Sequence, residues 1–368
     1  MINVTKSVII PFHSNDNLLA ACLYSVSQAI DPEDEIIVVA NNADQSALNF
    51  NFSDFSCKVI YRYENLMYPK AINLGAYHAK GEYLLFCDAD IYAHKHALSA
   101  LLQGLANNHM AAYASAKLLD FQTRRIWEFG TASSEINFPH PYRFREIDYP
   151  LCKSDRIVWG ACAACSAIKK ETFLQIGGFD ERLVCSYSDL DLAIRLRDKL
   201  GMQTICVADS LAYHQGGSTI GSGMDSFAKE DTKGIFLSKH PNIQWNLDQY
   251  IKDSCVHFRN LYKHNCREYI CVDASSIVNA QQYINCFSSF LDIRVLGEYR
   301  FPPRNRDAQR IDLINHVHHS LRSYQGPLLY FVDSYTALGG NSLWKECRCQ
   351  YDDIVIDRHA NVELLANI

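Results

Sequence analysis

The segment Tyr83–Cys87, YLLFC, is an apolar run that follows Gly81 and leads directly into Asp88, Ala89 and Asp90. A short, continuous apolar run between a glycine and polar residues is typical of a buried strand in a parallel sheet. Ligands of open α/β sheets bind at the carboxyl ends of such strands. We therefore expect the two aspartates to mark a ligand site.

Upstream of this segment, strand patterns alternate with helical ones. Strands are expected at residues 7–11 (SVIIP), Glu35–Ala40 and Lys58–Tyr61, and helices at residues 15–30 and 69–80. This β-α alternation predicts a doubly wound, mostly parallel α/β sheet.

Downstream, the pattern continues less regularly to about residue 240. We expect a strand at residues 112–118, an apolar run at 157–168, a helix from Asp189, a strand ending at His214 and a mobile Gly/Ser-rich loop at 216–223. Past residue 242 the strand candidates are 269–272, Leu328–Val332 and 354–356. The prediction is a domain over residues 1–250 and a small α/β unit of unknown role over 255–368, in which Asp273 and Asp333 follow strands.

Composition narrows the class of protein. The chain has 368 residues, 48% of them hydrophobic and 21% charged, which is typical of a soluble globular protein. A net charge of −6 gives no reason to expect nucleic acid as a partner. The 14 cysteines are spread through apolar segments, so we expect free, buried thiols. The close pairs at 162/165 and 347/349 lack a second pair at zinc-finger spacing.

No secretory leader is expected, because an apolar strand begins within the first residues. No apolar run approaches the ~18–20 residues that span a bilayer. These observations favour a cytoplasmic protein, and leave open a peripheral association with the inner face of a membrane through a partner or a lipid-linked acceptor.

The sequence Asp88-Ala89-Asp90 suits a divalent cation beside a diphosphate, because hard cations prefer carboxylate oxygens. One acid can face a ribose while the other faces the metal. The alternative is a turn or a helix N-cap, where aspartate is also common.

Several further motifs occur in a characteristic order: SVIIPFHS, VVANNAD, the helix segment from Lys70 to Gly75, CDAD, GACAACSAIKKETFLQIGGFDERL, SDLDL from Ser188, and YHQGGS around His214. In this order they resemble the family-2 inverting glycosyltransferases, which have the GT-A fold, over about residues 5–220. The resemblance implies transfer of a sugar from a nucleotide-diphosphate donor, a UDP-sugar by default with dTDP and GDP open, to a glycan or lipid-linked saccharide acceptor. It departs at two places: asparagines stand where the second strand of the family usually ends in aspartate, and Ser188 stands where the family has glutamate.

The resemblance assigns roles to individual residues. Asp189 is the expected general base, with a plain helix N-cap as the alternative, and Asp191 is expected to play a supporting or structural part. Asp90 and His214 are the expected ligands of Mn²⁺ or Mg²⁺, although a lone histidine is more often structural. A surface-polysaccharide role follows by analogy only.

The remaining expected contacts fall on two sides of the reaction. Residues expected on the donor side are Pro11, Asn41, Asn42, Lys70, Asn73, Asp88, Ala89 and Asp90. For Lys70 a solvated helix position is equally open. The acceptor side is expected to include Trp159, Gly160 and Tyr187, whose aromatic rings could stack on sugars or belong to the core. The 216–223 loop either orders over the donor or is a plain connector.

Two other functions compete with transfer. A nucleotidyltransferase would carry a Gly-rich, basic loop after its first strand, but residues 12–17 are FHSNDN. A catalytically inactive glycan-binding or scaffolding protein on the same fold would show no metal-dependent hydrolysis of nucleotide-sugars.

Overall fold

The computed structural model describes residues 5–41, 50–133, 138, 140–184, 186–215, 226–243 and 246, and the strand residues 268–273, 293–299, 328–332, 354–357 and 362–364. The chain divides into two compact units: residues 1–131 with 142–243, and residues 132–141 with 244–368. Each unit is described by itself.

The first unit is an α/β structure. Its strands are β1 Lys6–Phe12, β2 Glu35–Ala40, β3 Lys58–Tyr61, β4 Tyr83–Cys87, β5 Ile91–Ala93, β6 Ala111–Asp120, β7 Ile126–Glu128, β8 Arg156–Val158, β9 Cys165–Lys169 and β10 Gln203–His214. Its helices are α1 Asp16–Ser27, α2 Met67–His78, α3 Ala97–Asn107, α4 Lys170–Gln175, α5 Ser188–Leu200 and α6 Ser226–Lys239, with short 3₁₀ turns at Phe52–Asp54 and Pro150–Cys152.

The strands form one ten-stranded sheet in the order β3-β2-β1-β4-β9-β6-β10-β5, with β7 beside β6 and β8 beside β10. The pairs β3-β2, β2-β1, β1-β4 and β6-β10 are parallel, whereas β9 runs antiparallel to both of its neighbours. The strand order reverses direction at β1, which is the type of position where open α/β sheets bind ligands.

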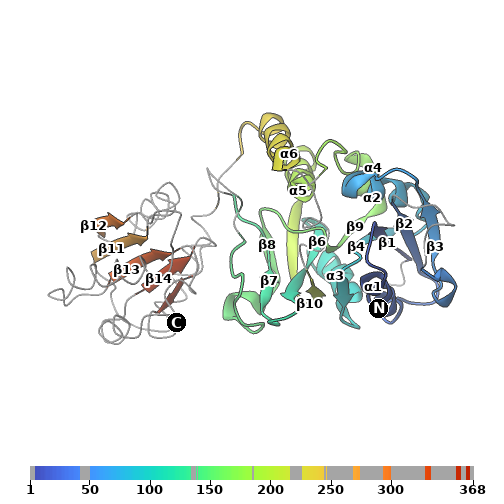
Figure 1. Cartoon of the computed structure of the whole chain (residues 1–368), viewed down its shortest axis with the longest axis horizontal. Helices are drawn as coiled ribbons and strands as arrows, with labels where there is room; N and C mark the ends of the chain where they lie inside the picture. Colours follow the sequence, from blue (N-terminus) through green and yellow to red (C-terminus); the bar gives the residue numbers. More distant parts are fainter. Residues whose placement is uncertain are drawn as a thin grey trace. The chain divides into compact units, whose positions relative to one another are not determined.

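Both faces of the sheet are buried under helices. In β1, Val8, Ile10 and Phe12 face α1 and α3, and Ile9 faces α2, α4 and α5. Figure 1 shows α1 and α3 toward the bottom of the view and α2, α4 and α5 toward the top. Because both faces are covered, the strands have continuous apolar sequences, and this is why the first four parallel strands are recognisable in the sequence.

Cysteines in the described part of the first unit are free: Cys22, Cys57, Cys87, Cys152, Cys162, Cys165 and Cys206. Most of them are buried, as expected for thiols that act as small hydrophobic groups. Among the described residues, no helix is both long and apolar enough to cross a bilayer.

The second unit contains a five-stranded sheet in the order β12-β11-β13-β14-β15. Its strands are β11 Glu268–Asp273, β12 Ile293–Tyr299, β13 Leu328–Val332, β14 Ile354–Asp357 and β15 Val362–Leu364. The first four run parallel and β15 is antiparallel to β14. Asp273 is the last residue of β11, whereas Asp333 and the 216–223 segment lie outside the described residues.

Candidate active site

Two aspartates from the end of β4 and one histidine from the end of β10 meet at the carboxyl edge of the sheet. Asp88 and Asp90 follow β4, and the chain continues into the short strand β5. In the antiparallel pair of β5 and β10, Ile91 is the partner of His214. This register brings His214 next to Asp90, although 124 positions separate them in the sequence.

The side chains of Asp88, Asp90 and His214 each offer one ligand atom, and these atoms lie within 4.8 Å of one another. His214 Nε2 is 3.4 Å from an oxygen of Asp90. Asp88 Oδ1 and His214 Nδ1 are buried and have no hydrogen-bond partner within the described part of the chain. Buried polar atoms without partners are costly, and two carboxylates with an imidazole are a donor set that suits Mn²⁺. The residues therefore fit a divalent cation.

The charges in the cluster also favour a bound cation, as the pKa values of Asp88 and His214 indicate. Burial, followed by the negative charge of Asp90, raises the pKa of Asp88 to about 7. Burial alone would lower the pKa of His214, but its hydrogen bond to Asp90 and the neighbouring negative charges raise it instead. Carboxylates crowded in a buried position repel one another, and a bound cation relieves this repulsion.

Asp189 lies at the start of α5, in the first turn of the helix, and is half-buried. Its Oδ1 accepts a hydrogen bond of 2.8 Å from the backbone N–H of Leu190. The charge of Asp189 contributes to the raised pKa of Asp88, so the two carboxylates are within electrostatic reach of one another. The expected base and the expected metal ligands are thus in one neighbourhood.

The other expected donor-side residues lie in two settings. Asn41 is buried directly after β2, and its Oδ1 has no hydrogen-bond partner among the described residues, which suits a ligand contact. Pro11 in β1 and Ala89 are half-buried at the same edge of the sheet. Asn42 lies outside the described residues.

The two expected contacts on α2 have protein partners. Lys70 is exposed, and its Nζ lies 4.0 Å from Glu64. Asn73 donates to the backbone carbonyl of Phe179 and accepts from the Phe179 N–H, both at 2.9 Å. These bonds tie α2 to the Gly-Gly-Phe-Asp turn at residues 177–180, so contacts of Lys70 and Asn73 with a donor stay predictions.

The three residues expected on the acceptor side are near α5. Trp159 is 7% exposed, with the guanidinium carbon of Arg197 5.7 Å from its ring centroid. A Cβ at Gly160 would lie 2.6 Å from a methyl group of Leu190, so residue 160 lies close to α5 and a larger residue there would displace that side chain. Tyr187 is half-buried immediately before the helix. The burial of Trp159 favours its alternative as a core residue.

Some side chains beside the cluster have no motif to identify them in the sequence. Glu128 in β7 is buried and accepts hydrogen bonds from Thr131 Oγ1 and from the N–H of Cys162. The ring of Trp127, one residue earlier, lies 6.2 Å from that of His214. Tyr68 and Tyr113 lie near Asp189. Burial raises the pKa of each tyrosine, and the negative charge of Asp189 adds to this effect.

Residues 7–173 match the family model described as "Glycosyl transferase family 2". Among curated proteins, "O-antigen biosynthesis protein RfbC" of Myxococcus xanthus is 28% identical over 223 residues, 58% of this chain and 17% of that protein. "Putative polypeptide N-acetylgalactosaminyltransferase 10" of Caenorhabditis briggsae is 29% identical over 203 residues, 49% of this chain and 31% of that protein. The chain thus spans less than a third of the length of either relative.

Among solved structures, the crystal structure of GalNAc-T7 with UDP, GalNAc and Mn²⁺ superposes with a TM-score of 0.50 at 16% sequence identity. The superposition covers 69% of this chain and 55% of that one. At this level of identity the likeness concerns the fold alone.

Proposed function

We propose that this protein transfers a sugar from a nucleotide-diphosphate donor to an acceptor hydroxyl with the help of a divalent cation. The first unit has the GT-A fold, and its residues 7–173 match the family model of glycosyl transferase family 2. The observation that carries the proposal is the Asp88, Asp90 and His214 cluster at the carboxyl edge of the sheet. Its two unpartnered buried atoms are the strongest support for a metal.

Asp88, Asp90 and His214 would hold Mn²⁺ or Mg²⁺. When bound, such a cation neutralises the charge that develops on the departing diphosphate. Asn41 and Pro11 are proposed to contact the nucleoside, because Pro11 lies next to the last residue of β1 and Asn41 directly follows the neighbouring strand β2. UDP is the first candidate, and GDP and dTDP are the others.

Asp189 is the proposed general base of a single in-line displacement that inverts the anomeric centre. It takes the proton from the acceptor hydroxyl while that oxygen attacks the anomeric carbon. Its half-buried position near the metal cluster supports this role. The acceptor is proposed to be a glycan or a lipid-linked saccharide, by analogy with the O-antigen relative. A cytoplasmic location with peripheral membrane association stays a prediction.

The first test measures release of nucleoside diphosphate from a panel of UDP-, GDP- and dTDP-sugars, with Mn²⁺ or with EDTA. A transferase slowly transfers its donor sugar to water, and we expect release that depends on the metal. An inactive glycan-binding or scaffolding protein predicts no release from any donor.

The second test addresses the base. Asp189→Asn should retain donor binding and lose turnover by at least a hundredfold, in the range expected for removal of a general base. Asp198→Asn is the matched control, because Asp198 is exposed near the other end of the same helix. Near-normal turnover of Asp189→Asn would remove Asp189 from this role.

A further inference from the structure

The start of α5 needs support from other parts of the fold. Tyr187, immediately before the helix, has a left-handed backbone with φ of 68°, and its own side chain makes no capping hydrogen bond to the helix. The Asp189 side chain bonds the N–H of the next residue. Contacts of the helix with its neighbours therefore set the direction in which Asp189 points.

Asp191 provides the strongest of these contacts. Two residues correspond to about 200° around an α-helix, so Asp191 points roughly opposite to Asp189. Asp191 is fully buried, and its Oδ2 accepts from Arg195 Nε at 2.7 Å. Arg195 also donates to the carbonyl oxygens of Ile176 and Gly178, at 2.9 and 2.7 Å. Holding Asp191 thus fixes the rotation of the first helical turn, and with it the direction of Asp189.

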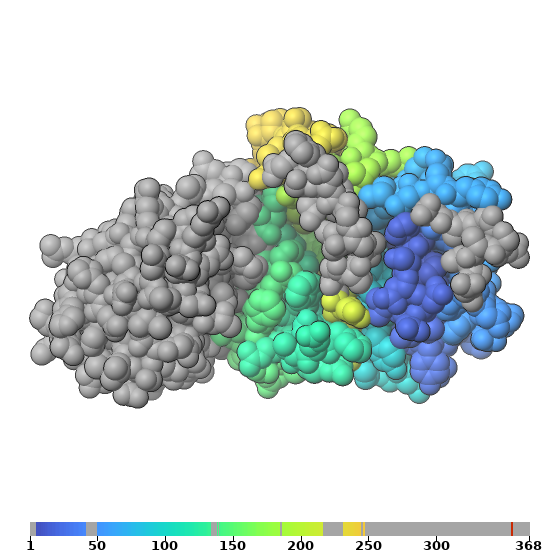
Figure 2. Space-filling model, viewed as in Figure 1, coloured from blue at the N-terminus to red at the C-terminus, as the bar shows by residue number. Residues whose placement is uncertain are grey.

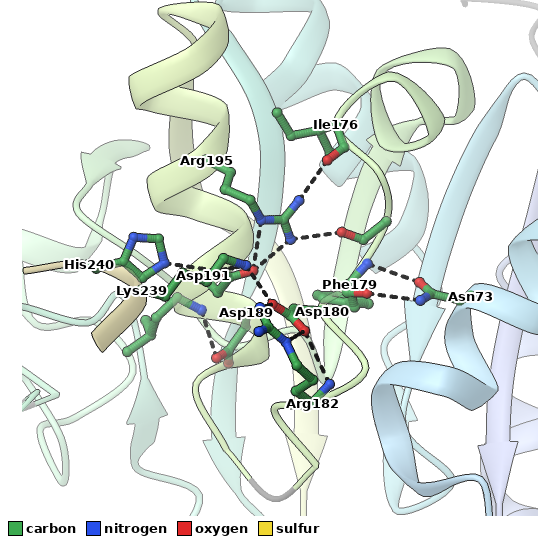
Figure 3. A network of polar contacts seen from close by, with 12 residues as sticks. Asn73, Ile176, Phe179, Asp180, Arg182, Asp189, Asp191, Arg195, Lys239 and His240 are labelled. Atoms are coloured by element: carbon green, nitrogen blue, oxygen red, sulfur yellow. Dashed lines mark hydrogen bonds and ion pairs between the residues drawn. The ribbon is translucent and has the colours of Figure 1, made fainter. Parts of the chain in front are cut away.

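The other oxygen of Asp191 is held by the end of α6. Lys239 Nζ lies 2.6 Å and His240 Nε2 2.8 Å from Asp191 Oδ1. Lys239 Nζ also lies 2.7 Å from Asp180, at the end of the Gly-Gly-Phe-Asp turn. Figure 3 shows Lys239 and His240 on one side of Asp191 and Arg195 on the other.

An aromatic contact adds to these bonds. The ring of Phe236, one turn before His240, stacks on that of Tyr187 with centroids 5.0 Å apart and an interplanar angle of 23°. Phe236 is fully buried, although the opposite side of α6 lies at the surface of the unit, where Figure 2 shows it in yellow. Phe236 and Lys239 therefore contact residues two positions before and two positions after Asp189.

We propose that Phe236, Lys239 and His240 are positioning residues, which together form an α6 clamp that holds Tyr187 and the first turn of α5 so that Asp189 faces the acceptor hydroxyl. This inference rests on the proposed function for the role of Asp189. The clamp acts on the proton-transfer step rather than on the donor, because its contacts are with α5 and the 177–180 turn and not with the metal cluster.

The test compares Lys239→Met, Lys239→Arg and Lys233→Met in the full-length chain, at least 15 °C below the melting temperature of each variant. Lys233 is the control, since it lies on the same helix and forms no ion pair with Asp180 or Asp191 among the described residues. Each variant is assayed for donor turnover with Mn²⁺, for its KM for the donor, and for the Kd of UDP with Mn²⁺.

The clamp predicts that kcat of Lys239→Met falls at least tenfold, while its donor KM and the Kd stay within twofold of wild type. Lys239→Arg should recover at least half of the lost rate, and Lys233→Met should match wild type. A kcat of Lys239→Met within twofold of wild type overturns the proposal, and so does a fall in kcat with an equal weakening of nucleotide binding.

Hydrogen exchange of the backbone amides in residues 186–192 separates the clamp from the proposed function. If wild-type protein releases no nucleotide from any donor, the proposed function fails, and exchange alone decides the clamp. We expect at least tenfold faster exchange of these amides in Lys239→Met than in wild type. Unchanged exchange would overturn the clamp whatever the activity.

Discussion

Replacing Arg195 with methionine should destabilise the first unit strongly. The Arg195 side chain is only 7% exposed and forms an i,i+4 ion pair with fully buried Asp191. It also donates to two backbone carbonyls, that of Ile176 just before the 177–180 turn and that of Gly178 within it. Methionine keeps most of the aliphatic packing but removes the charge and all three donor contacts.

The expected cost follows from these contacts. Removing one partner of a buried ion pair costs about 3–5 kcal/mol, because the other charge is left buried. Here Lys239 and His240 still contact Asp191, which lowers that cost. The orphaned carbonyls of Ile176 and Gly178 add about 1 kcal/mol or more each. We therefore expect a loss of about 3–5 kcal/mol in the free energy of unfolding.

Urea unfolding of the full-length chain, followed by fluorescence, measures this loss. With an m-value of about 2–3 kcal/mol per M, the midpoint should fall by about 1 M or more. Arg197→Met is the control, because this arginine of the same helix is one third exposed and pairs with exposed Asp198. A surface pair of this kind contributes less than about 1 kcal/mol.

A midpoint for Arg195→Met equal to that of Arg197→Met would refute the reasoning. It would mean that the buried network around Asp191 contributes no more to stability than a surface ion pair. An Arg195→Met variant that keeps its stability but loses activity would likewise show that the network contributes little to the free energy of unfolding.

Three further predictions concern the 177–180 turn and the metal cluster. In thermal melts, Gly178→Ala should be more destabilising than Gly177→Ala by about 1 kcal/mol or more. Both glycines have a positive φ, but only at Gly178 would a Cβ lie 2.6 Å from an oxygen, that of the Asn73 side chain. Because the pKa of Asp88 is raised to about 7, Mn²⁺ affinity measured by calorimetry should increase between pH 6 and 8, with release of protons. Hydrogen bonds from Arg182 hold the pKa of Asp180 below its ordinary value. The ionised Asp180 therefore stabilises the fold above about pH 4, and this stabilisation is lost as the pH falls. Between pH 5 and 2.5, the free energy of unfolding should thus fall more for wild type than for Asp180→Asn.

The parallel strands of the first unit could be predicted because burial on both faces makes them continuous apolar runs. The predicted bounds of Glu35–Ala40, Lys58–Tyr61, Tyr83–Cys87 and Leu328–Val332 match those of the structure. The doubly wound class follows from their alternation with helices, and the GT-A fold is confirmed.

Other elements could not be predicted from local pattern. Strand β12 contains Arg294, Gly297 and Glu298, which interrupt any apolar run. Strands β5 and β7 have three residues each, and their pairing with β10 and β6 defines them more than their composition does. The apolar run at 157–168 proved to be two strands, β8 and β9, separated by the segment that approaches α5.

At the site, the sequence identified residues that belong to motifs and missed those defined by packing. Asp90 and His214 were expected together, and Asp88 joins them. The partners of Asp191 on α6 are 48 and 49 positions away, and no spacing rule connects them. The place of Glu128 beside the site could not be predicted either, because only its buried hydrogen bonds distinguish it from a surface glutamate.

The cation site can be tested directly by calorimetry of UDP, GDP and dTDP with Mn²⁺, using wild type and His214→Ala. We predict that one nucleotide binds wild type only when Mn²⁺ is present, and that it binds His214→Ala at least tenfold more weakly. Equal binding by the two proteins, or binding to wild type that is unchanged in EDTA, would contradict a metal held by Asp88, Asp90 and His214.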